Sequence, residues 1–429
     1  MTTTTAPSTA VIQRARISDI SRTRRISTGV IEILVAVFIA FVFARTLQPD
    51  MFTKFVMTPG GITVGSMGDW VIRSQFTLYL LAALCVVIGA FQLIKGFGKF
   101  TNLMVGFVFL FLIFSFLTWQ AAGKSLNLAG MLSSSVQLAV PITLGAFSGI
   151  LCERAGVVNI AIEGMMLMSA MVGALMGSIT DSAWLGLFFG VLSSVLLAAL
   201  HAVLSIKYKI DQIISGTVIN MFSAGMTAFL SQKFLQTRQE LNNPAMFTRV
   251  EIPGLAEIPL LGPIFFNTNF FVYLMFALLI VIQVALFSTR WGLRMRSVGE
   301  HPKAADTLGI NVIKTRYMAV LLGGLVAGLG GAFFTLGSVG RFDEGMTAGK
   351  GFIGLAAMIF GNYTPVGALG AGILFGFADS IGSKLSLLGS TIPSTLMSTA
   401  PYIITMIVLA GFVGKGHVPA ADGVAYTKE

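Results

Sequence analysis

Charged residues are scarce in this 429-residue sequence. Asp, Glu, Lys and Arg together make up 11% of it, whereas apolar residues make up 55% and the mean hydropathy is +0.85. A soluble domain carries about a quarter charged residues, because its surface must be wetted by water. The composition therefore excludes one large soluble globule and predicts a chain whose surface faces lipid.

Cysteine and histidine are also rare. Cys85 and Cys152 lie in or at the end of apolar runs, which argues against a disulfide framework and indicates packing thiols. The three histidines, His201, His301 and His417, are scattered, and neither H-E-x-x-H nor G-x-S-x-G occurs. We therefore expect no metal site, no cofactor and no catalytic residues, and we predict that the chain is not an enzyme.

A complete phosphate-binding loop is missing as well. Such a loop reads G-x-x-x-x-G-K-[ST], because backbone amides must surround the phosphates and a hydroxyl must hold Mg²⁺. Gly123-Lys124-Ser125 comes near this pattern, but Thr118 replaces the leading glycine. We expect ATP hydrolysis, if the chain depends on it, to take place on a separate partner subunit.

The net charge of +10 does not indicate nucleic-acid binding. No basic stripe interleaved with exposed aromatic residues occurs, and the 35 phenylalanines lie largely within apolar runs. In membrane proteins, an excess of Lys and Arg marks the loops that stay in the cytoplasm. Basic residues gather in 14–25 and 289–316, with smaller groups at 95–99 and 207–209. Alternating spans from a cytoplasmic N-terminus place all of these segments, and the C-terminal tail, inside.

Apolar runs of membrane-spanning length recur along the chain. About 20 apolar helical residues cross a hydrocarbon core of roughly 30 Å. We therefore predict an all-α polytopic transmembrane helical bundle of about 10–12 spans, including short or broken membrane helices. The predicted spans are 29–47, 76–94, 102–122, 130–151, 157–179, 183–206, 212–234, 268–288, 317–338, 351–361, 365–386 and 396–414.

Two segments predict interruptions of the helical structure inside the membrane. Span 351–361 is too short to cross comfortably and runs into the turn signal of residues 361–365. Residues 156–164 form a second irregular stretch, directly after the charged pair Glu153-Arg154. Non-helical backbone in a membrane is tolerated only where protein or water covers it, so both breaks point to a translocation pathway. Their occurrence in both parts of the chain suggests two structurally related halves.

Polar residues within the predicted spans are the candidates for this pathway. A charged group at mid-bilayer costs about 2.5–3.5 kcal/mol on insertion scales, so it faces the bundle interior or water. Glu163, with Asn159 one turn earlier on the same helix face, is predicted to line or gate the pathway, and Asn220 and Asn362 are further candidates. An equally open alternative is a structural clamp, in which Glu163 fastens neighbouring helices through Arg154.

Four other polar residues in the spans need an interpretation. Gln137 and Asp379 share the ambiguity of Glu163 between pathway and clamp. His201 lies near a cytoplasmic helix end and is interpreted as a packing histidine whose ring nitrogens are satisfied. Glu32 lies close enough to the membrane interface that we expect its carboxylate to reach the headgroups.

The polar segment from Trp291 to Tyr317 lies between two predicted spans on the cytoplasmic side. Pro302 suits the first position of a helix, and Gly309 can end it in the left-handed conformation. The segment therefore predicts a short helix over residues 303–308. A helix this short needs a packing partner to be stable in water, and the alternative is a solvated basic loop.

The same segment carries a family resemblance. Residues 300–305 (EHPKAA), followed by 308–311 (LGIN), resemble the coupling-helix loop of bacterial ABC importer permeases in the ribose and branched-chain amino-acid permease superfamily. Residues 153–160 (ERAGVVNI) and 163–167 (EGMML) look like the branch that handles simple sugars and nucleosides. Residues 361–368 also fit, and the resemblance covers about 130 to 429.

The resemblance implies a permease subunit that forms the translocation pathway for a small polar solute, a nucleoside or a simple sugar, by alternating access. It implies a cytoplasmic ATP-binding subunit, a second permease subunit, identical or different, and an extracytoplasmic solute-binding protein at a bacterial plasma membrane. An ion-coupled secondary transporter or channel is the alternative, although it has no reason to keep such a loop. The residues implied to dock on the ATP-binding subunit are Glu300, His301, Pro302, Ala304, Ala305, Leu308 and Gly309.

The implied organisation has four parts. Residues 1–28 form a cytoplasmic basic tail, and residues 29–129 form an N-terminal extension with three transmembrane helices. Residues 130–415 form the permease core, which contains the coupling helix near 299–311, and residues 416–429 form a cytoplasmic tail.

Overall fold

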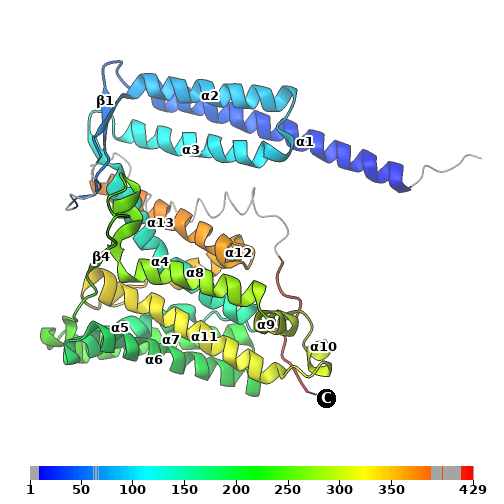
Figure 1. Cartoon of the computed structure of the whole chain (residues 1–429), viewed down its shortest axis with the longest axis vertical. Helices are drawn as coiled ribbons and strands as arrows, with labels where there is room; N and C mark the ends of the chain where they lie inside the picture. Colours follow the sequence, from blue (N-terminus) through cyan, green and yellow to red (C-terminus); the bar gives the residue numbers. More distant parts are fainter. Residues whose placement is uncertain are drawn as a thin grey trace, which may run out of the picture. The chain divides into compact units, whose positions relative to one another are not determined.

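The described part of the chain is almost entirely helical (Figure 1). The computed structural model describes residues 9–60, 62, 65, 67–387, 399 and 417–428. Within these residues, ten helices are long and apolar enough to cross a membrane, which confirms the predicted all-α polytopic bundle. The last predicted span, 396–414, lies outside the described residues.

Two compact units make up the chain, and each has its own packing. Three of the long apolar helices belong to the N-terminal unit, and the other helices described belong to the second. The N-terminal unit comprises Met1–Thr58, Met67–Leu128 and Leu387–Ser390, and the second unit comprises Pro59–Ser66, Ala129–Ser386 and Thr391–Glu429.

The N-terminal unit is a bundle of three helices. Helices α1 and α2 approach closely, because a Cβ added at either Gly29 or Gly89 would lie 3.1 Å from the carbonyl oxygen of the other. Its helical parts are α1 (Thr9–Phe38), which continues in wider π-helical turns over Ile39–Ala44, α2 (Ser74–Ile94), a 3₁₀ turn (Gly98–Phe100) and α3 (Thr101–Gln120).

A small sheet lies in the connections of this unit. Strand β1 (Phe52–Val56) pairs antiparallel with β2 (Trp70–Arg73) and parallel with β3 (Ser125–Asn127), so that the strand order is β2-β1-β3. The buried Phe55 ring of β1 stacks on Phe114 of α3 at a centroid distance of 5.3 Å. This contact fixes the strands to the ends of the helices.

The expected position of Glu32 is wrong. Glu32 is only 1% exposed. It faces Gly89 of α2, since a Cβ added at Gly89 would lie 3.2 Å from the Cβ of Glu32. The close approach of α1 and α2 turns this face of α1 into the bundle, so the carboxylate does not reach the interface. Neither carboxylate oxygen has a hydrogen-bond partner among the described residues.

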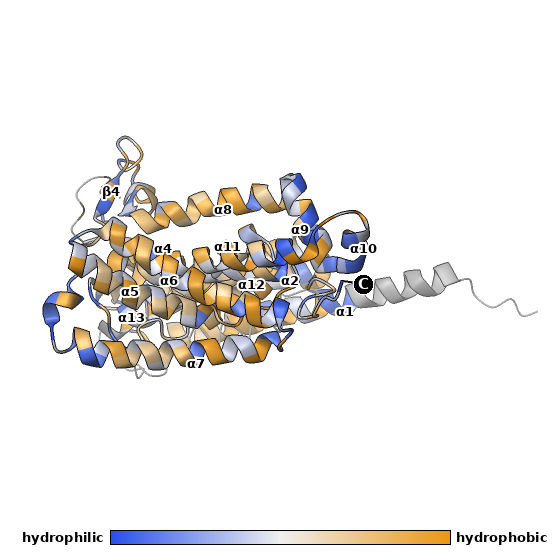
Figure 2. Cartoon of the chain, turned by 90° about the horizontal axis from the view of Figure 1, so that it is seen from below, coloured by the Kyte–Doolittle hydropathy of each residue, from blue (hydrophilic) through white to orange (hydrophobic). Residues whose placement is uncertain are grey.

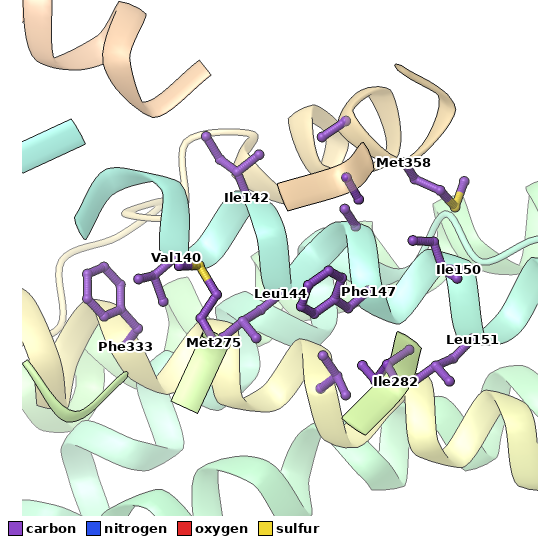
Figure 3. Close-up of a cluster of buried hydrophobic side chains, with 14 of the residues drawn as sticks. Val140, Ile142, Leu144, Phe147, Ile150, Leu151, Met275, Ile282, Phe333 and Met358 are labelled. Atoms are coloured by element: carbon purple, nitrogen blue, oxygen red, sulfur yellow. The ribbon is translucent and has the colours of Figure 1, made fainter. Parts of the chain in front are cut away.

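The second unit is built around three buried helices, α4 (Leu128–Glu153), α5 (Ile162–Thr180) and α11 (Val312–Ala332). In α4, 89% of the membrane-spanning window is buried, against 28% in α7 and in α8. Figure 3 shows Leu144 and Phe147 of α4 packed among side chains of neighbouring helices. The flanking helices are α6 (Ala183–Ala202), α7 (Gln212–Leu230) and α8 (Phe270–Ser288), and their exposed apolar faces are suited to lipid.

Glycines of α11 set its distance from α5 and α6. A Cβ at Gly331 would lie 2.1 Å from the carbonyl oxygen of Met166, and one at Gly324 would lie 2.3 Å from the Cβ of Ala198. No side chain fits on either glycine, so the backbone of α11 lies directly against its neighbours, as expected where lipid gives no apolar driving force for helix association. This packing holds α5, and the polar residues at its start, in the middle of the unit.

Shorter elements connect the long helices. Strand β4 (Arg249–Glu251) pairs antiparallel with β5 (Asn267–Asn269). Helices α9 (Arg290–Glu300) and α10 (Pro302–Thr307) follow α8, whereas α12 (Lys350–Phe360) and α13 (Pro365–Leu387) follow α11. The remaining short helical turns described are Val203–Lys207, Ser231–Leu235, Gln239–Asn242, Gly262–Phe266 and Phe333–Val339.

Candidate coupling surface and broken-helix centre

The predicted short helix is present as α10. Pro302 occupies its first turn, and Gly309 follows its end with φ +80°, a left-handed conformation that suits glycine. His301 caps the helix, because its Nδ1 accepts a hydrogen bond from the backbone N–H of Ala304 at 3.1 Å. His301 was predicted only as a docking residue, although its position directly before Pro302 was a signal for this capping role.

The residues expected to dock divide between two faces of α10. Glu300, His301, Ala304, Leu308 and Gly309 are exposed, and Leu308 is 81% exposed. Pro302 is half-buried, whereas Ala305 is 2% exposed and packs against Val298 and Val312. Ala305 therefore anchors α10 to the unit, and the outer face presents a large apolar side chain to the solvent. Figure 2 shows the hydrophilic surroundings of α9 and α10 beside the apolar spans.

The C-terminal segment 417–428 packs against this loop. The backbone N–H of Ala421 donates to the carbonyl oxygen of Gly299 at 2.9 Å, and the Tyr426 hydroxyl donates to Asp306 at 2.8 Å. Arg316 of α11 donates to the carbonyl oxygen of Val424 at 2.8 Å. These contacts give α10 the packing partner that a helix of its length needs. The segment was predicted only as a tail, because its contacts are not local in sequence.

A buried polar cluster lies beneath the segment 417–428. The carboxyl groups of Glu153 and Asp422 lie close enough to influence each other's charge, and two neighbouring carboxyl groups disfavour ionisation of both at once. Burial raises the pKa of Asp422 to about 6, although the bonds to Glu153 and the Gly423 amide and the charge of Arg316 lower it. Burial likewise raises the pKa of Tyr363. The docked segment therefore binds a proton at Asp422 more tightly than a solvent-exposed aspartate would.

Arg154 fastens α4 to the turn after α12. Its Nε and Nη2 donate to the carbonyl oxygen of Tyr363 at 3.0 and 2.9 Å, and its guanidinium lies 5.6 Å from the ring centroid of Phe287. Burial, and then the positive charge of Arg296, lower the pKa of Arg154. The predicted clamp between Arg154 and Glu163 is therefore wrong in its partner, because Arg154 binds the backbone of the turn that contacts the C-terminal segment 417–428.

The connection between α4 and α5 is not helical. Side chains of α6 and α7 form hydrogen bonds with its backbone N–H and carbonyl groups. The N–H of Val158 donates to Gln212 at 2.6 Å, and its carbonyl oxygen lies 3.0 Å from Nε2 of His201. Asn220 donates to the carbonyl oxygen of Ile160 at 2.9 Å. This arrangement is what a membrane demands of irregular backbone.

His201 is confirmed as a satisfied packing histidine. Its Nδ1 lies 3.0 Å from the hydroxyl of Ser215, while its Nε2 lies close to the carbonyl oxygen of Val158. Because both ring nitrogens have partners within the fold, the imidazole joins α6, α7 and the irregular connection.

Asn159 is not one turn before Glu163 on the same helix face. Helix α5 begins at Ile162, so Asn159 lies in the irregular connection instead. Its side chain is fully buried, with Oδ1 accepting from the N–H of Ala161 at 3.1 Å and Nδ2 3.5 Å from Sγ of Cys152. The prediction was wrong because helix continuity was assumed where α6 and α7 supply the hydrogen bonds. Asn159 holds the connection and lies away from any open surface.

Glu163 binds the N-terminus of α12. Its Oε1 accepts from the hydroxyl of Thr347 at 2.7 Å and the N–H of Gly349 at 2.9 Å, and its Oε2 accepts from the N–H of Gly351 at 2.7 Å. A carboxylate at this end of a helix satisfies orphan amides and complements the helix dipole. A Cβ at Gly351 would lie 2.7 Å from the Cα of Glu163, so only glycine permits the contact.

Asn220 lies at the same junction, on α7. Its Oδ1 accepts from the N–H of Gly164 at 2.7 Å, next to Glu163. The structure thus brings Glu163 and Asn220 together at the start of α5, where the irregular connection meets the first turn of α12. The N-termini of α5 and α12 meet here, and polar side chains accept hydrogen bonds from backbone N–H groups of both.

Helix α12 turns back onto α13. Asn362 and Tyr363 of the turn have φ of +52° and +56°, and Lys350 at the start of α12 forms an ion pair with Asp379 of α13. The predicted interruption after the short span is therefore present, since α12 ends at this turn and α13 begins directly after it. Asn362 itself is exposed, and its Oδ1 accepts from the N–H of His417 at 2.8 Å, so it contacts the C-terminal segment and not the start of α12. Gln137 is half-buried in α4.

A polar cavity of about 860 Å³ lies at the opposite end of α7 from residue 212. Gln236 donates to Glu344 at 3.1 Å, and Arg341 forms an ion pair with Asp343 at 3.1 Å. No sequence signal identified this cavity, because its lining comes from two loops distant in the chain. Its size lies in the range of small-molecule sites.

The whole second unit thus has the parts of a membrane permease: buried central helices, satisfied helix breaks and a short amphiphilic helix at one end. Residues 131–413 match the family of the branched-chain amino acid transport system permease component. Because this match spans more than half of the chain, the protein belongs to that family, which confirms the resemblance found in the sequence. It is a multi-pass membrane protein.

Several of its relatives are permeases by name. The chain is 42% identical over 300 residues to the guanosine ABC transporter permease protein NupQ of Bacillus subtilis, covering 68% of this chain and 94% of that one. It is 41% identical over 300 residues to the nucleoside ABC transporter permease protein NupC of Lactococcus lactis, covering 67% and 93%. A putative glucose ABC transporter permease protein of Haloferax volcanii, TsgC13, is 33% identical over 324 residues, covering 70% and 98%. No match to a solved structure was found.

Proposed function

We propose that this chain is a translocation subunit of an ATP-driven importer of nucleosides. The observation that carries the proposal is the identity of 42% and 41% to permeases named for guanosine and nucleosides over nearly their whole length. The glucose permease relative shares 33%, which favours a nucleoside over a sugar. The chain itself is non-catalytic in this proposal, and ATP hydrolysis belongs to a partner.

The proposed contact with an ATP-binding subunit is the outer face of α10. Leu308 is 81% exposed there, and an apolar side chain so placed at a polar surface suits a pocket on another protein. Glu300, His301, Pro302, Ala304 and Gly309 surround it, while the inward Ala305 transmits motion to α9 and α11. Closure of the ATP-binding subunits would then move the helices that carry the broken centre.

The second permease subunit is proposed to be a different, related chain. Lactococcus lactis has two nucleoside ABC transporter permease proteins related to this chain, NupC at 41% and NupB at 24% identity. Haloferax volcanii likewise has two glucose permeases, related at 33% and 25%. A closer and a more distant relative in one organism is the pattern expected of a heterodimer.

The proposed orientation places α9, α10 and both termini in the cytoplasm of a bacterium, since basic residues gather in those segments. The polar cavity near Gln236 then opens outside, where a solute-binding protein would deliver the nucleoside. Its amide and charged side chains match the hydroxyls and base edges of such a solute.

The junction of α5 and α12 is the proposed gate. Glu163 holds the start of α12 in the described conformation, and Asn220 holds the start of α5 beside it. Asn159 holds the irregular connection before α5, whereas Asn362 holds the turn at the other end of α12. Release of the α12 N-terminus from Glu163 would free backbone amides and a carboxylate to face the pathway. Alternating access would then consist of making and breaking this contact.

The substrate is tested by uptake in a bacterial strain that lacks its own nucleoside importers. The chain is expressed with its genomic ATP-binding, permease and solute-binding partners, and labelled guanosine is compared with labelled glucose. The proposal predicts guanosine uptake that stops when the ATP-binding subunit is inactivated. Glucose uptake alone would refute the nucleoside assignment, and uptake unaffected by the inactive subunit would favour an ion-coupled carrier.

A further inference from the structure

A strongly basic cavity lies at one end of the N-terminal unit. It has a volume of about 690 Å³, and half of the ten residues that line it are cationic: Arg22, Arg24, Arg25, Lys95 and Lys99. None of the described lining residues carries a negative charge. Five like charges around one cavity repel each other, so an anion in the cavity would stabilise the arrangement.

The cavity lies where three apolar spans end. Those spans are Arg22–Ala44, Ser74–Ile94 and Gly98–Gln120, so the cationic residues lie at the level at which a bilayer changes from hydrocarbon to headgroups. Ile94 is 75% exposed and Phe100 is 65% exposed beside it. Apolar side chains next to cations suit a ligand that has both an anionic and a hydrocarbon part.

The frame of the cavity is fixed by hydrogen bonds. Gln92, which is 1% exposed, accepts from the N–H of Phe97 at 3.0 Å and donates to the hydroxyl of Thr28 at 2.9 Å. Arg24 donates to the side-chain oxygen of Asn102 at 2.7 Å, which links α1 to α3. The loop that carries the lysines is therefore held against α1 before a ligand arrives.

Glycine at position 96 allows Arg25 to take part. Gly96 has φ +75°, and a Cβ there would lie 2.8 Å from Cδ of Arg25, so the arginine stem packs over bare backbone. The Nε of Arg25 is buried and has no hydrogen-bond partner among the described residues. This N–H still lacks an acceptor, and phosphate oxygens match the fork of donors that a guanidinium presents.

We propose that this cavity binds the phosphate headgroup of an anionic phospholipid, with the acyl chains lying against the apolar residues beside it. Basic pockets between transmembrane helices are suited to such headgroups. The site lies outside residues 131–413, so it belongs to the extension and not to the part shared with the family. The lipid would anchor the three-helix unit in the inner leaflet.

The test uses the full chain in nanodiscs and a variant in which two exposed cations of the cavity are removed, Lys95→Gln with Lys99→Gln. The matched control removes two cations of the same unit that do not line the cavity, Arg45→Gln with Arg73→Gln. Phosphatidylglycerol retained by each protein is quantified by mass spectrometry against phosphatidylcholine. At about 1 kcal/mol for each cation, the cavity variant is expected to bind phosphatidylglycerol roughly thirtyfold more weakly, with the control unchanged.

Several results would overturn the proposal. Equal retention of phosphatidylglycerol and phosphatidylcholine would refute a headgroup site, and an equal loss in the control would show unspecific attraction. A competing titration with glycerol phosphate separates the sources of phosphate: displacement of the lipid at micromolar concentration would assign the cavity to a soluble phosphate instead. Adding Arg25→Gln should weaken retention further, and circular dichroism checks that each variant is folded.

Discussion

At the scale of single residues, the structure turns a suspected pathway carboxylate into a helix cap. Glu163 uses both oxygens on donors of the segment 347–351, so its partner lies far away in sequence. Sequence analysis could single out Glu163 because a charge in an apolar run needs a reason. It could not find the partner, since nothing local to Glu163 points to α12.

Glu163→Gln is expected to weaken this cap. The amide oxygen can still accept from Thr347 and Gly349, but its NH₂ group would face the N–H of Gly351, and one charge-assisted bond is lost. The expected loss is about 1.5–3 kcal/mol of unfolding free energy, together with reduced guanosine uptake. Thermal unfolding in detergent and uptake in cells measure the two effects.

Asp211→Asn is the matched control. Asp211 caps α7 through a single oxygen, Oδ1, which accepts from the N–H groups of Ile213 and Ile214 at 2.9 and 3.0 Å. Asparagine keeps that oxygen, so neither stability nor uptake should change. If Glu163→Gln behaves like this control, the carboxylate does not hold α12.

Asp422 makes docking of the C-terminal segment dependent on pH. Its pKa rises from an ordinary 3.8 to about 6 on burial, so the docked state binds the proton more tightly than the free segment does. The stabilisation is fully present below pH 3.8 and is lost as pH rises through 6. Between pH 7.5 and pH 5 the docked population relative to the free one should rise roughly tenfold.

A spin label on Lys428→Cys, with Cys85 and Cys152 replaced by alanine, reports the mobility of this segment. Mobility is expected to fall as the pH is lowered from 7.5 to 5. Asp422→Asn should remove the dependence. A segment that becomes more mobile at pH 5 would show that protonation of the pair formed with Glu153 does not favour docking.

At the scale of elements, the sequence predicted those features whose signals are local. Helix α10 follows from Pro302 and Gly309, and the short α12 follows from its length and the turn at 361–365. The start of α5 was placed too early because the hydrogen bonds that replace helical ones come from α6 and α7. The contacts of segment 417–428 were missed for the same physical reason: they join parts of the chain distant in sequence.

Leu308→Ser tests the outer face of α10. The side chain is 81% exposed, so the change should alter the free energy of unfolding by no more than about 0.5 kcal/mol. If Leu308 fills a pocket on the ATP-binding subunit, the affinity between the two proteins should fall roughly thirtyfold, as for a central contact residue. Binding of the purified subunits is measured by biolayer interferometry.

Val424→Ser is the control for this change. Val424 is 54% exposed on the neighbouring C-terminal segment, so the substitution removes a similar exposed apolar side chain outside α10. Its affinity for the ATP-binding subunit should stay unchanged. Equal affinities of the unchanged chain, Leu308→Ser and Val424→Ser for the ATP-binding subunit would place the docking surface elsewhere.

At the scale of the whole molecule, a family core of about 300 residues follows an N-terminal unit of three helices. Composition alone was enough to predict the membrane bundle, since a chain with 11% charged residues and repeated apolar runs has no other way to be solvated. The solute was not predictable in the same way, because composition and hydropathy indicate membrane spans but carry no information on which solute crosses them. The proposed solute rests instead on the names of the relatives.

The central claim is that this chain moves a nucleoside only when a partner hydrolyses ATP. The direct measurement is accumulation of labelled guanosine in proteoliposomes that contain the chain, its permease partner and the ATP-binding subunit, with the solute-binding protein supplied on the outer side. The account predicts accumulation with ATP on the cytoplasmic side and none without ATP or with an inactive ATP-binding subunit. Accumulation driven by an ion gradient in liposomes that contain this chain alone would contradict it.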